Sequence, residues 1–302
     1  MMSDLPIDLV RTLLAVVDEG TFDAAAGALH VTPSAVSQRV KALEQRTGRV
    51  LLVRTKPVRP TESGAVIVRF ARQLARLEQD AHTALGMTGS AETTRVSIAV
   101  NADSLATWFL PALTRVPEEL RACYELRRED EDHTAQLLRE GLVMAAVTSS
   151  PDAVAGCSVR ALGRMRYLPV AAPAFAQRWL GAGSDVPLRE VIADAPVVAF
   201  DRRDDFQDAF VRRLRRGHRA SAQQHFVPTS EGFVDAVAAG MGWGMLPAAQ
   251  AEPLLDAGRL VLLAPDRSTE VPLFWQQWKL DSPALTAVAE AVAAAAADAL
   301  GT

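Results

Sequence analysis

Apolar residues in the first 19 positions repeat at the spacing of a helix. The stretch PIDLVRTLLAVVD (6–18) places its apolar side chains on one stripe, formed by Ile7, Leu9, Val10, Leu13, Leu14 and Val17. Gly20 is placed to end this helix, and Thr21 is placed to cap a second one. That second helix, FDAAAGALH, is short and rich in alanine, which lets another helix pack closely across it.

A third stripe follows at Val36, Val40 and Leu43, and it predicts a helix from about Pro33 to Gln45. Thr32 can cap this helix, and proline is favoured at its first position because the missing N–H would have no partner there. The pattern therefore predicts a helix-turn-helix. The face opposite the apolar stripe carries Thr32, Pro33, Ser34, Ala35, Ser37, Gln38, Arg39 and Lys41.

Such a face suits the major groove of DNA. Short hydroxyls at the leading end allow close approach, Gln38 can pair with adenine, and Arg39 and Lys41 can reach guanine edges or phosphates. Two short strands, about 49–53 and 57–60, are expected to form a wing whose Arg54, Lys56 and Arg59 could touch the flanking backbone.

The charge distribution changes the weight of this interpretation. The window 39–59 holds seven basic residues and one acidic residue, a net +6, so the rest of the chain sums to −10 within a total of −4. A basic block on an acidic chain favours contact with a polyanion. The alternatives are a solvated basic face and a helical hairpin that binds nothing.

From Thr61 to about Leu85 the pattern predicts one long helix. Apolar residues alternate at spacings of three and four, typical of a coiled-coil seam, at Ile67, Phe70, Leu74, Leu77 and Ala81. We expect dimerisation here, because a major-groove reader usually pairs with a second copy. The alternative is a helix packed on its own chain. Residues 86–94, GMTGSAETT, read as a linker.

In the last two thirds of the chain, strands alternate with helices. Strands are expected at 95–100, 123–130, 142–148 and 196–200, with paired strands around 157–171. Alternation of this kind predicts α/β units on mostly parallel sheets, here as two small lobes with a cleft between them.

Polar residues gather at the ends of these strands, where ligands lie in such folds. Asp201 is followed closely by Asp204 and Asp205, and the full candidate set is Asp103, Ser104, Thr107, Glu129, Asp130, Thr148, Asp201, Ser230 and Glu231. Hydroxyls and helix N–H groups suit a carboxylate, and several acids suit an amine, so a basic amino acid satisfies both. Each residue could equally be a helix cap.

Other classes of protein find little support. The chain has no nucleophile elbow, P-loop, complete dinucleotide fingerprint or paired-histidine motif, so we expect no enzyme, cofactor or metal. No apolar run is long enough to span a bilayer, no export signal is visible, and two cysteines suggest reduced thiols. A cytoplasmic location in a bacterium, at the nucleoid when bound to DNA, is expected.

The stretch FDAAAGALHVTPSAVSQRVKALEQRTG, with Arg54 and the TESG that starts at Thr61, resembles the LysR-type transcriptional regulators. VNADSLATW, VVAFDRRDD and VPLFWQQWKLDSP look like the branch of LysG and ArgP. The resemblance implies an α/β protein overall. An all-α winged helix-turn-helix domain would span 1–60, and a linker helix and hinge 61–91. A two-lobed effector domain, similar to periplasmic binding proteins, would span 92–302, with lobe I at about 92–163 and 265–302 and lobe II at about 164–264.

The same resemblance implies a function. L-lysine or L-arginine would bind between the lobes and change the spacing or bend of paired DNA-binding domains, and the protein would activate an amino acid exporter gene. Double-stranded operator DNA and a second copy, as dimer or tetramer, are the implied partners, and RNA polymerase is a candidate.

Two alternatives stay open. A nucleoid-associated or replication-initiation-inhibiting protein would bind DNA without responding to amino acids. A cytosolic enzyme or amino-acid-binding protein with an incidental N-terminal domain would show turnover, or tight ligand binding without any effect on DNA.

Overall fold

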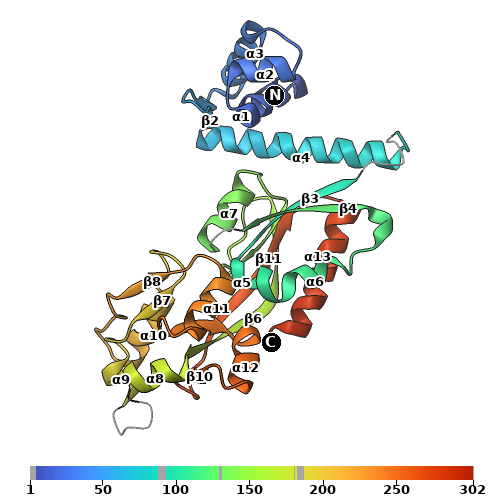
Figure 1. Ribbon diagram of the computed structural model, residues 1–302. Coiled ribbons are helices and arrows are strands. Elements are labelled where there is room, and N and C mark those ends of the chain that lie inside the picture. Colours follow the sequence, from blue (N-terminus) through green and yellow to red (C-terminus); the bar gives the residue numbers. More distant parts are fainter. Residues whose placement is uncertain (1–4, 88–92, 129–130, 180, 182–186, 302) are drawn as a thin grey trace.

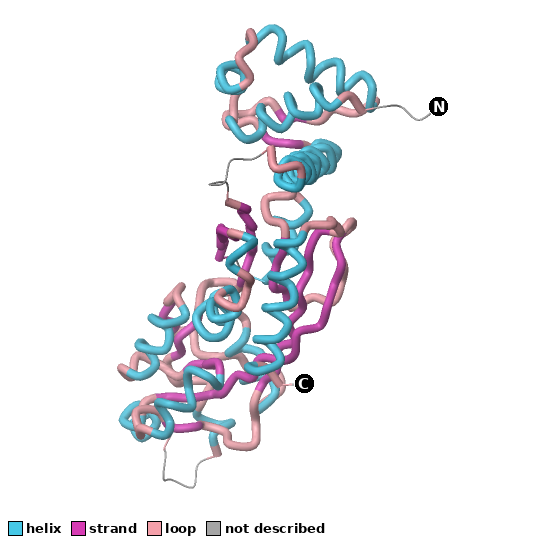
Figure 2. Tube along the Cα trace, turned by 90° about the vertical axis from the view of Figure 1, so that its right-hand side faces the viewer, coloured by secondary structure: helices cyan, strands magenta, loops and turns pink. Residues whose placement is uncertain are grey.

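The computed structural model describes residues 5–87, 93–128, 131–179, 181 and 187–301. The chain forms a small N-terminal domain, a long helix and a larger C-terminal domain, and the helix lies between the two domains (Figures 1 and 2).

The N-terminal domain has its own apolar core. Its elements are α1 (Ile7–Glu19), α2 (Phe22–Ala28), α3 (Pro33–Thr47), β1 (Leu52–Val53) and β2 (Arg59–Pro60). The predicted caps are confirmed, whereas α2 ends two residues earlier and α3 two residues later than expected. Gly20 adopts φ 73° at the end of α1, and the hydroxyls of Thr21 and Thr32 accept hydrogen bonds from the backbone of α2 and α3. The wing strands are shorter than expected, and they pair antiparallel.

The wing is fixed by the residues around it. Glu44 accepts a hydrogen bond from the Leu51 N–H at 2.9 Å, and the Thr61 hydroxyl donates to the Val50 carbonyl at 2.8 Å. Gly64 lies so close that a Cβ atom there would be 1.9 Å from the Leu51 carbonyl oxygen. The TESG stretch therefore joins the wing to the start of the long helix.

The long helix is α4 (Glu62–Ala84), whose 23 residues span about 35 Å at 1.5 Å per residue. Val68 and Ala71 are buried in the core of the N-terminal domain, so one face of α4 belongs to that domain. Another face lies against the C-terminal domain (Figure 1).

The C-terminal domain is built on a seven-stranded sheet with the strand order β10-β6-β11-β5-β3-β4 and with β9 paired to β6. Its strands are β3 (Thr94–Val100), β4 (Ala122–Arg128), β5 (Ala145–Thr148), β6 (Cys157–Ala171), β9 (Gly244–Pro247), β10 (Val261–Leu262) and β11 (Thr269–Trp278). The expectation of mostly parallel sheets was wrong for this sheet. β3 is parallel to β4 and β5, but β11 is antiparallel to both of its neighbours, β5 and β6.

Paired strands around 157–171 were also a wrong prediction, because this segment is the single strand β6. Gly163 has φ 139°, and the register against β11 shifts opposite it, between Leu273 and Phe274. The glycine thus accommodates a bulge rather than a turn. β6 and β11 consequently run through both lobes.

Lobe I consists of β3, β4, β5, the neighbouring halves of β6 and β11, and the helical segments α5 (Ala102–Ser104), η1 (Leu105–Phe109), α6 (Leu110–Leu113), η2 (Glu118–Leu120), α7 (Glu131–Arg139) and α13 (Pro283–Ala299). Lobe II contains the remaining halves of β6 and β11, β9, β10, the parallel pair β7 (Val197–Ala199) and β8 (Gln224–Phe226), and α8 (Pro173–Trp179), α9 (Leu188–Val191), α10 (Phe206–Leu214), α11 (Ser230–Ala238) and α12 (Ala248–Asp256).

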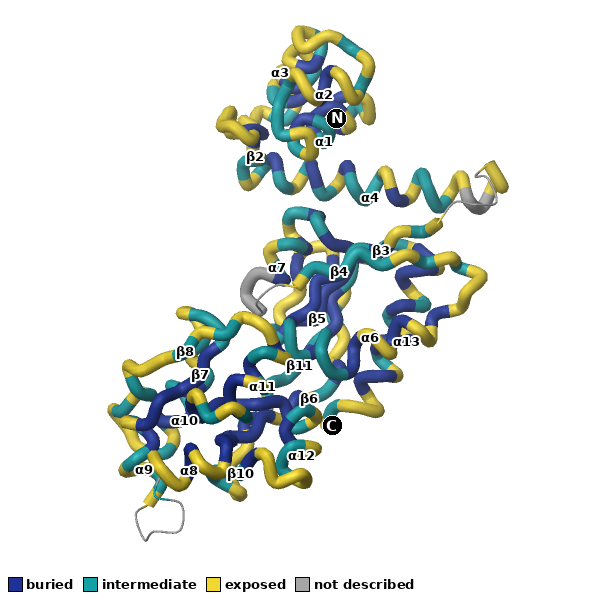
Figure 3. The backbone as a smooth tube through the Cα atoms, viewed as in Figure 1, coloured by how far each residue is buried: buried dark blue, intermediate teal, exposed yellow. Residues whose placement is uncertain are grey.

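The lobes share an apolar core that continues from one to the other, and lobe II has a second cluster of its own (Figure 3). Within the described residues, no helix is long and apolar enough to cross a bilayer.

Candidate functional sites

The first site is the outer face of α3. This helix lies on the side of the N-terminal domain that faces away from α4 (Figure 1). Val36, Val40 and Leu43 are buried beneath it. The exposed positions are Thr32, Pro33, Ser34, Ser37, Gln38 and Lys41, and Ala35 and Arg39 are partly exposed. The predicted residues therefore lie together on one accessible strip.

The wing adds basic side chains beside this strip. Arg54 and Lys56 are exposed, and the Arg54 guanidinium lies 5.6 Å from the centre of the Phe22 ring at the start of α2. A cation held over an aromatic ring is positioned without being neutralised.

The outward face of α4 is apolar. Val66, Phe70 and Leu77 are 54%, 41% and 43% exposed. Of the predicted seam, Phe70, Leu77 and Ala81 are exposed and Leu74 is partly exposed, while Ile67 packs against the core of the N-terminal domain. Val66 was not in the predicted set, although its spacing of four from Phe70 was the available signal.

The second site is a cavity of about 410 Å³ between the lobes. Lobe I contributes the end of β3 and the start of α5. Lobe II contributes the loop after β7, the starts of α10 and α11, and one residue of α12. Among its lining residues, four are aspartates, Asp103, Asp201, Asp204 and Asp205, and one is a cation, Arg203.

Asp103 joins the two lobes. Its carboxylate accepts a hydrogen bond from the Tyr167 hydroxyl on β6 at 2.7 Å and another from the Ser230 hydroxyl at the start of α11, also at 2.7 Å. Burial raises the pKa of Asp103 above its ordinary value, the two hydrogen bonds oppose this rise, and nearby Glu231 adds to it.

The other aspartates shape the loop between β7 and α10. Asp204 accepts hydrogen bonds from the backbone N–H groups of Phe200 and Phe206, and its burial raises its pKa. Asp201 accepts from two backbone N–H groups through Oδ1 alone. Asp205 is largely exposed and lies 3.5 Å from Arg212. Within the part of the chain that the structure describes, Asp201 Oδ2 and both oxygens of Asp205 accept no hydrogen bond from this loop.

The cavity lining unites Asp103, Asp201 and Ser230 from the predicted effector set, but other members lie elsewhere. Ser104 is fully buried, and Thr107 donates to the carbonyl of Asp103 within its own helix. Thr148 is buried among Ser150 and Gln276, and Glu231 is exposed outside the lining. Glu129 and Asp130 lie outside the described residues.

Several lining residues were missed by the strand-end argument. Tyr167, Asn101, Gln207 and Gln250 lie in or beside a strand or on a helix, yet they face the cavity. Tyr167 had a signal, because it is one of two tyrosines and stands in an apolar strand where its hydroxyl needs a partner. The Asn101 and Gln207 side-chain oxygens are buried without a hydrogen-bond partner at the wall of the cavity.

Comparison with known protein families shows in which kind of protein these two sites occur together. Residues 7–65 match the bacterial regulatory helix-turn-helix protein of the lysR family, and residues 89–297 match the LysR substrate binding domain. The chain belongs to the LysR family. The resemblance seen in the sequence is confirmed, and so is an N-terminal helix-turn-helix domain joined to an α/β effector domain.

Similar LysR proteins are named as transcriptional regulators rather than enzymes. The HTH-type transcriptional regulator LysG of Mycobacterium tuberculosis is 48% identical, covering 95% of this chain and 92% of that protein. The lysine export transcriptional regulatory protein LysG of Corynebacterium glutamicum is 42% identical, covering 98% and 99%. Full-length C. glutamicum LysG with bound effector arginine has a TM-score of 0.85 at 41% identity, covering 98% of this chain and all of that one.

Among the described residues of this LysR protein, no group of three or more His, Cys, Asp or Glu side chains is arranged to hold a metal ion. Cys123 is exposed, Cys157 is buried, and both are free thiols.

Proposed function

We propose that the protein senses a basic amino acid, L-lysine or L-arginine, in the cavity between its lobes. The observation that carries this proposal is the charge of the lining, with four aspartates against one arginine. The cavity of about 410 Å³ suits a ligand of amino acid size. The arginine bound to C. glutamicum LysG supports the same ligand class.

The two ends of the cavity suit two cationic groups. Asp103 and the unpartnered oxygen of Asn101 lie at the lobe I end, where an α-ammonium group would find acceptors. Asp201, Asp205 and the oxygen of Gln207 lie at the lobe II end, where a side-chain ammonium or guanidinium group would find them. A ligand that contacts both lobes favours the arrangement that holds them together.

A thermal-shift screen of the twenty amino acids tests this proposal, because ligand that binds the folded state raises its stability. L-lysine and L-arginine should raise the melting temperature. L-citrulline, which has the shape of arginine without its charge, is the matched control and should give a much smaller rise. An equal rise with citrulline, or a rise with glutamate alone, would contradict a cation site.

We further propose that ligand binding controls transcription from a promoter operator and activates an amino acid exporter gene. The support is the exposed strip on α3 and the lysine export regulators among its relatives. A duplex selected from a random library by the full-length protein provides the probe. Binding to it at fixed salt should change when arginine is added. Tight binding that ignores all amino acids would instead favour a nucleoid-associated or replication-inhibiting protein. Contact with RNA polymerase and a cytoplasmic location belong to the same proposal.

The apolar face of α4 is proposed to pair with a second copy of the chain, as a dimer or as part of a tetramer. Phe70→Asp is the test, because Phe70 is 41% exposed in the single chain and its change leaves the core intact. The expected result is a smaller assembly by analytical ultracentrifugation with an unchanged circular dichroism spectrum. An unaltered sedimentation profile would place the interface elsewhere.

A further inference from the structure

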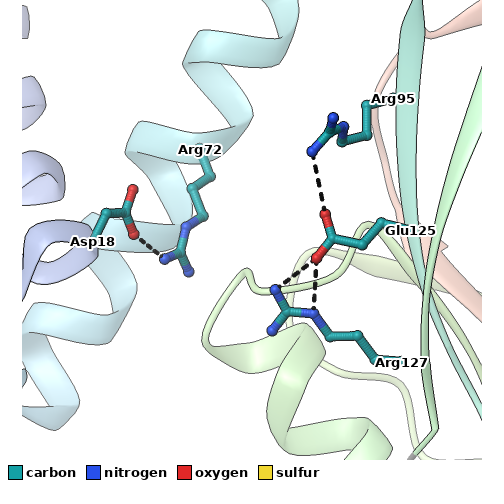
Figure 4. A network of polar contacts seen from close by, with 5 residues as sticks. All are labelled: Asp18, Arg72, Arg95, Glu125 and Arg127. Atoms are coloured by element: carbon teal, nitrogen blue, oxygen red, sulfur yellow. Dashed lines mark hydrogen bonds and ion pairs between the residues drawn. The ribbon is translucent and has the colours of Figure 1, made fainter.

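The contact between α4 and lobe I is polar and incompletely packed. A cavity of about 310 Å³ lies there, lined among others by Asp18, Arg72, Arg95, Glu125 and Arg127. Figure 4 shows Arg72 and Asp18 on one side of this cavity and the ion pairs of Glu125 with Arg95 and Arg127 on the other. Ion pairs of partly exposed side chains contribute little stability, so this contact between α4 and lobe I can rearrange at a low cost in free energy.

Arg72 contacts all three parts of the molecule. It projects from α4, and its guanidinium donates to the Asp18 carboxylate on α1 at 2.5 Å and to the Glu140 carbonyl oxygen at the end of α7 at 2.8 Å. The Arg72 side chain is 18% exposed and that of Asp18 is 48% exposed, so the bond to Glu140 is the more shielded of the two contacts. One planar group thus fixes the N-terminal domain and lobe I at the same time.

A second ion pair between the same two helices provides a comparison. Arg11 on α1 contacts Glu78 on α4 at 2.5 Å, the same distance as the Asp18 pair. Among the described contacts, this pair joins α1 to α4 without a bond to lobe I. The two pairs therefore hold the same helices, but Arg72 also reaches the effector domain.

Strand β3 connects the contact between α4 and lobe I to the cavity between the lobes. Buried Arg76, one helical turn after Arg72, donates to the Arg95 carbonyl oxygen at the start of β3 and pairs with Asp80 on its own helix. β3 then leads to Asn101 and Asp103 in the cavity lining. This strand, buried along its second half, spans about 20 Å at 3.3 Å per residue. A movement of Asp103 relative to lobe II would therefore be transmitted along β3 to its contact with Arg76 on α4.

We propose that Arg72 is the positioning residue that couples the interlobe cavity to the DNA-binding domain, by holding Asp18 and Glu140 together in one of the two states that the ligand selects. The inference rests on the proposed function, since it requires a ligand-dependent change in DNA binding. Coupling is measured as the factor by which one ligand changes the affinity of the other.

Two full-length variants separate this role from simple structural support. Arg72→Gln and Arg11→Gln each remove one positive charge and one ion pair between α1 and α4, and only Arg72→Gln also loses the bond to lobe I. DNA affinity is measured for the duplex selected by the wild-type protein, at fixed salt, without arginine and with saturating arginine. Arginine affinity without DNA is measured by calorimetry.

For coupling of ordinary size, arginine changes the DNA affinity of the wild-type protein by about 5–150-fold. In Arg72→Gln this factor should fall to within about twofold of one, while arginine affinity without DNA and the melting profile stay close to wild type. Arg11→Gln should keep the wild-type factor. Asp18→Ala, which removes the acceptor on α1 and leaves the lobe I contact in place, should reproduce the loss.

A wild-type response in Arg72→Gln overturns the inference, and so does an equal loss in Arg11→Gln, because the bond to lobe I would then be irrelevant. If Arg72→Gln does not fold, Asp18→Ala tests the inference, and a wild-type response to arginine in that variant overturns it. A wild-type protein that binds DNA but does not respond to arginine removes the proposed function itself, and the coupling with it.

Discussion

The strip on α3 and the cavity between the lobes are built in opposite ways. The strip proposed to bind DNA comes from ten consecutive residues, Thr32 to Lys41, presents its polar side chains to solvent, and overlaps a basic window. The cavity draws on residues from Asn101 to Val271 and is acidic. A contiguous strip keeps its geometry whenever one helix forms, whereas the cavity exists only when distant segments meet.

The two sites also use charge differently. The basic side chains beside the α3 strip are accessible from solvent, so their summed field can steer a polyanion to the surface. Buried carboxylates are costly to ionise, which is why burial raises the pKa of Asp103 and Asp204 in the cavity lining. A cationic ligand would offset that cost, so the cavity is suited to gain more from its ligand than the open strip gains from any one contact.

The largest expected effect is a loss of stability in the N-terminal domain that the C-terminal domain does not share. Gly64→Ala places a Cβ atom 1.9 Å from the Leu51 carbonyl oxygen, so the wing must move away from α4. We expect a loss of about 3 kcal/mol or more in the unfolding free energy of the N-terminal domain. Calorimetry should show an earlier melting step, while arginine binding at room temperature persists. A wild-type melting profile would contradict the packing of TESG on the wing.

A smaller effect is expected from the charge of the cavity. Asp201→Asn keeps the Oδ1 atom that accepts from Arg203 and Asp204 but removes the negative charge. Arginine affinity should fall by about 2–3 kcal/mol, as for a lost hydrogen bond to a charged group, with DNA binding in the absence of arginine unchanged. Asp256→Asn, exposed at the end of α12, is the matched control. Unchanged arginine affinity in calorimetry would remove Asp201 from the site.

On the α3 strip, Arg39→Ala should lower affinity for the selected duplex by about 1–3 kcal/mol, because a base contact is lost. Binding to a random duplex should change much less. Lys56→Ala in the wing serves as the comparison, since a phosphate contact weakens both duplexes equally and lowers the salt dependence. Electrophoretic mobility shifts at several salt concentrations provide the measurement. Wild-type discrimination in the Arg39 variant would argue against base reading by this residue.

The smallest expected effect is a pH-dependent change in the stability of the protein without ligand, caused by Asp103. The pKa of Asp103 in the folded protein lies above its ordinary value of 3.8, so the folded state binds more protons than the unfolded state in the pH range between these two values. This group therefore lowers stability as pH rises through that range. Asp103→Asn has no such loss, and its side chain can accept from Tyr167 and donate to Ser230, which then donates to Gln250.

We expect Asp103→Asn to be more stable than the wild type at neutral pH by a difference on the order of 1 kcal/mol. The difference should shrink as pH falls toward 3.8. Denaturant titrations at a series of pH values measure it. A difference that is constant with pH would show that Asp103 is ionised at little cost in the folded protein.

The sequence by itself determined the local structures. Helix periodicity, the caps at Thr21 and Thr32 and the glycine at position 20 each act within a few residues, so the N-terminal helices and the long helix could be predicted closely. The family was recognisable for the same reason, since its motifs are contiguous. The α/β class could be predicted from the alternation of strands and helices alone, and so could the acids at strand ends, Asp103 and Asp201.

Only the tertiary structure decided how distant segments meet. Whether Gly163 marked a turn or a bulge depended on β11, more than a hundred residues later, and this choice made β6 one strand through both lobes. Tyr167 on β6 and Ser230 on α11 reach Asp103 because lobe II packs against the end of β3 in lobe I. Arg72 reaches both Asp18 and Glu140 because α4 lies between the two domains. Side-chain periodicity reports which face of an element is buried, but it carries no record of the partner against which that face packs.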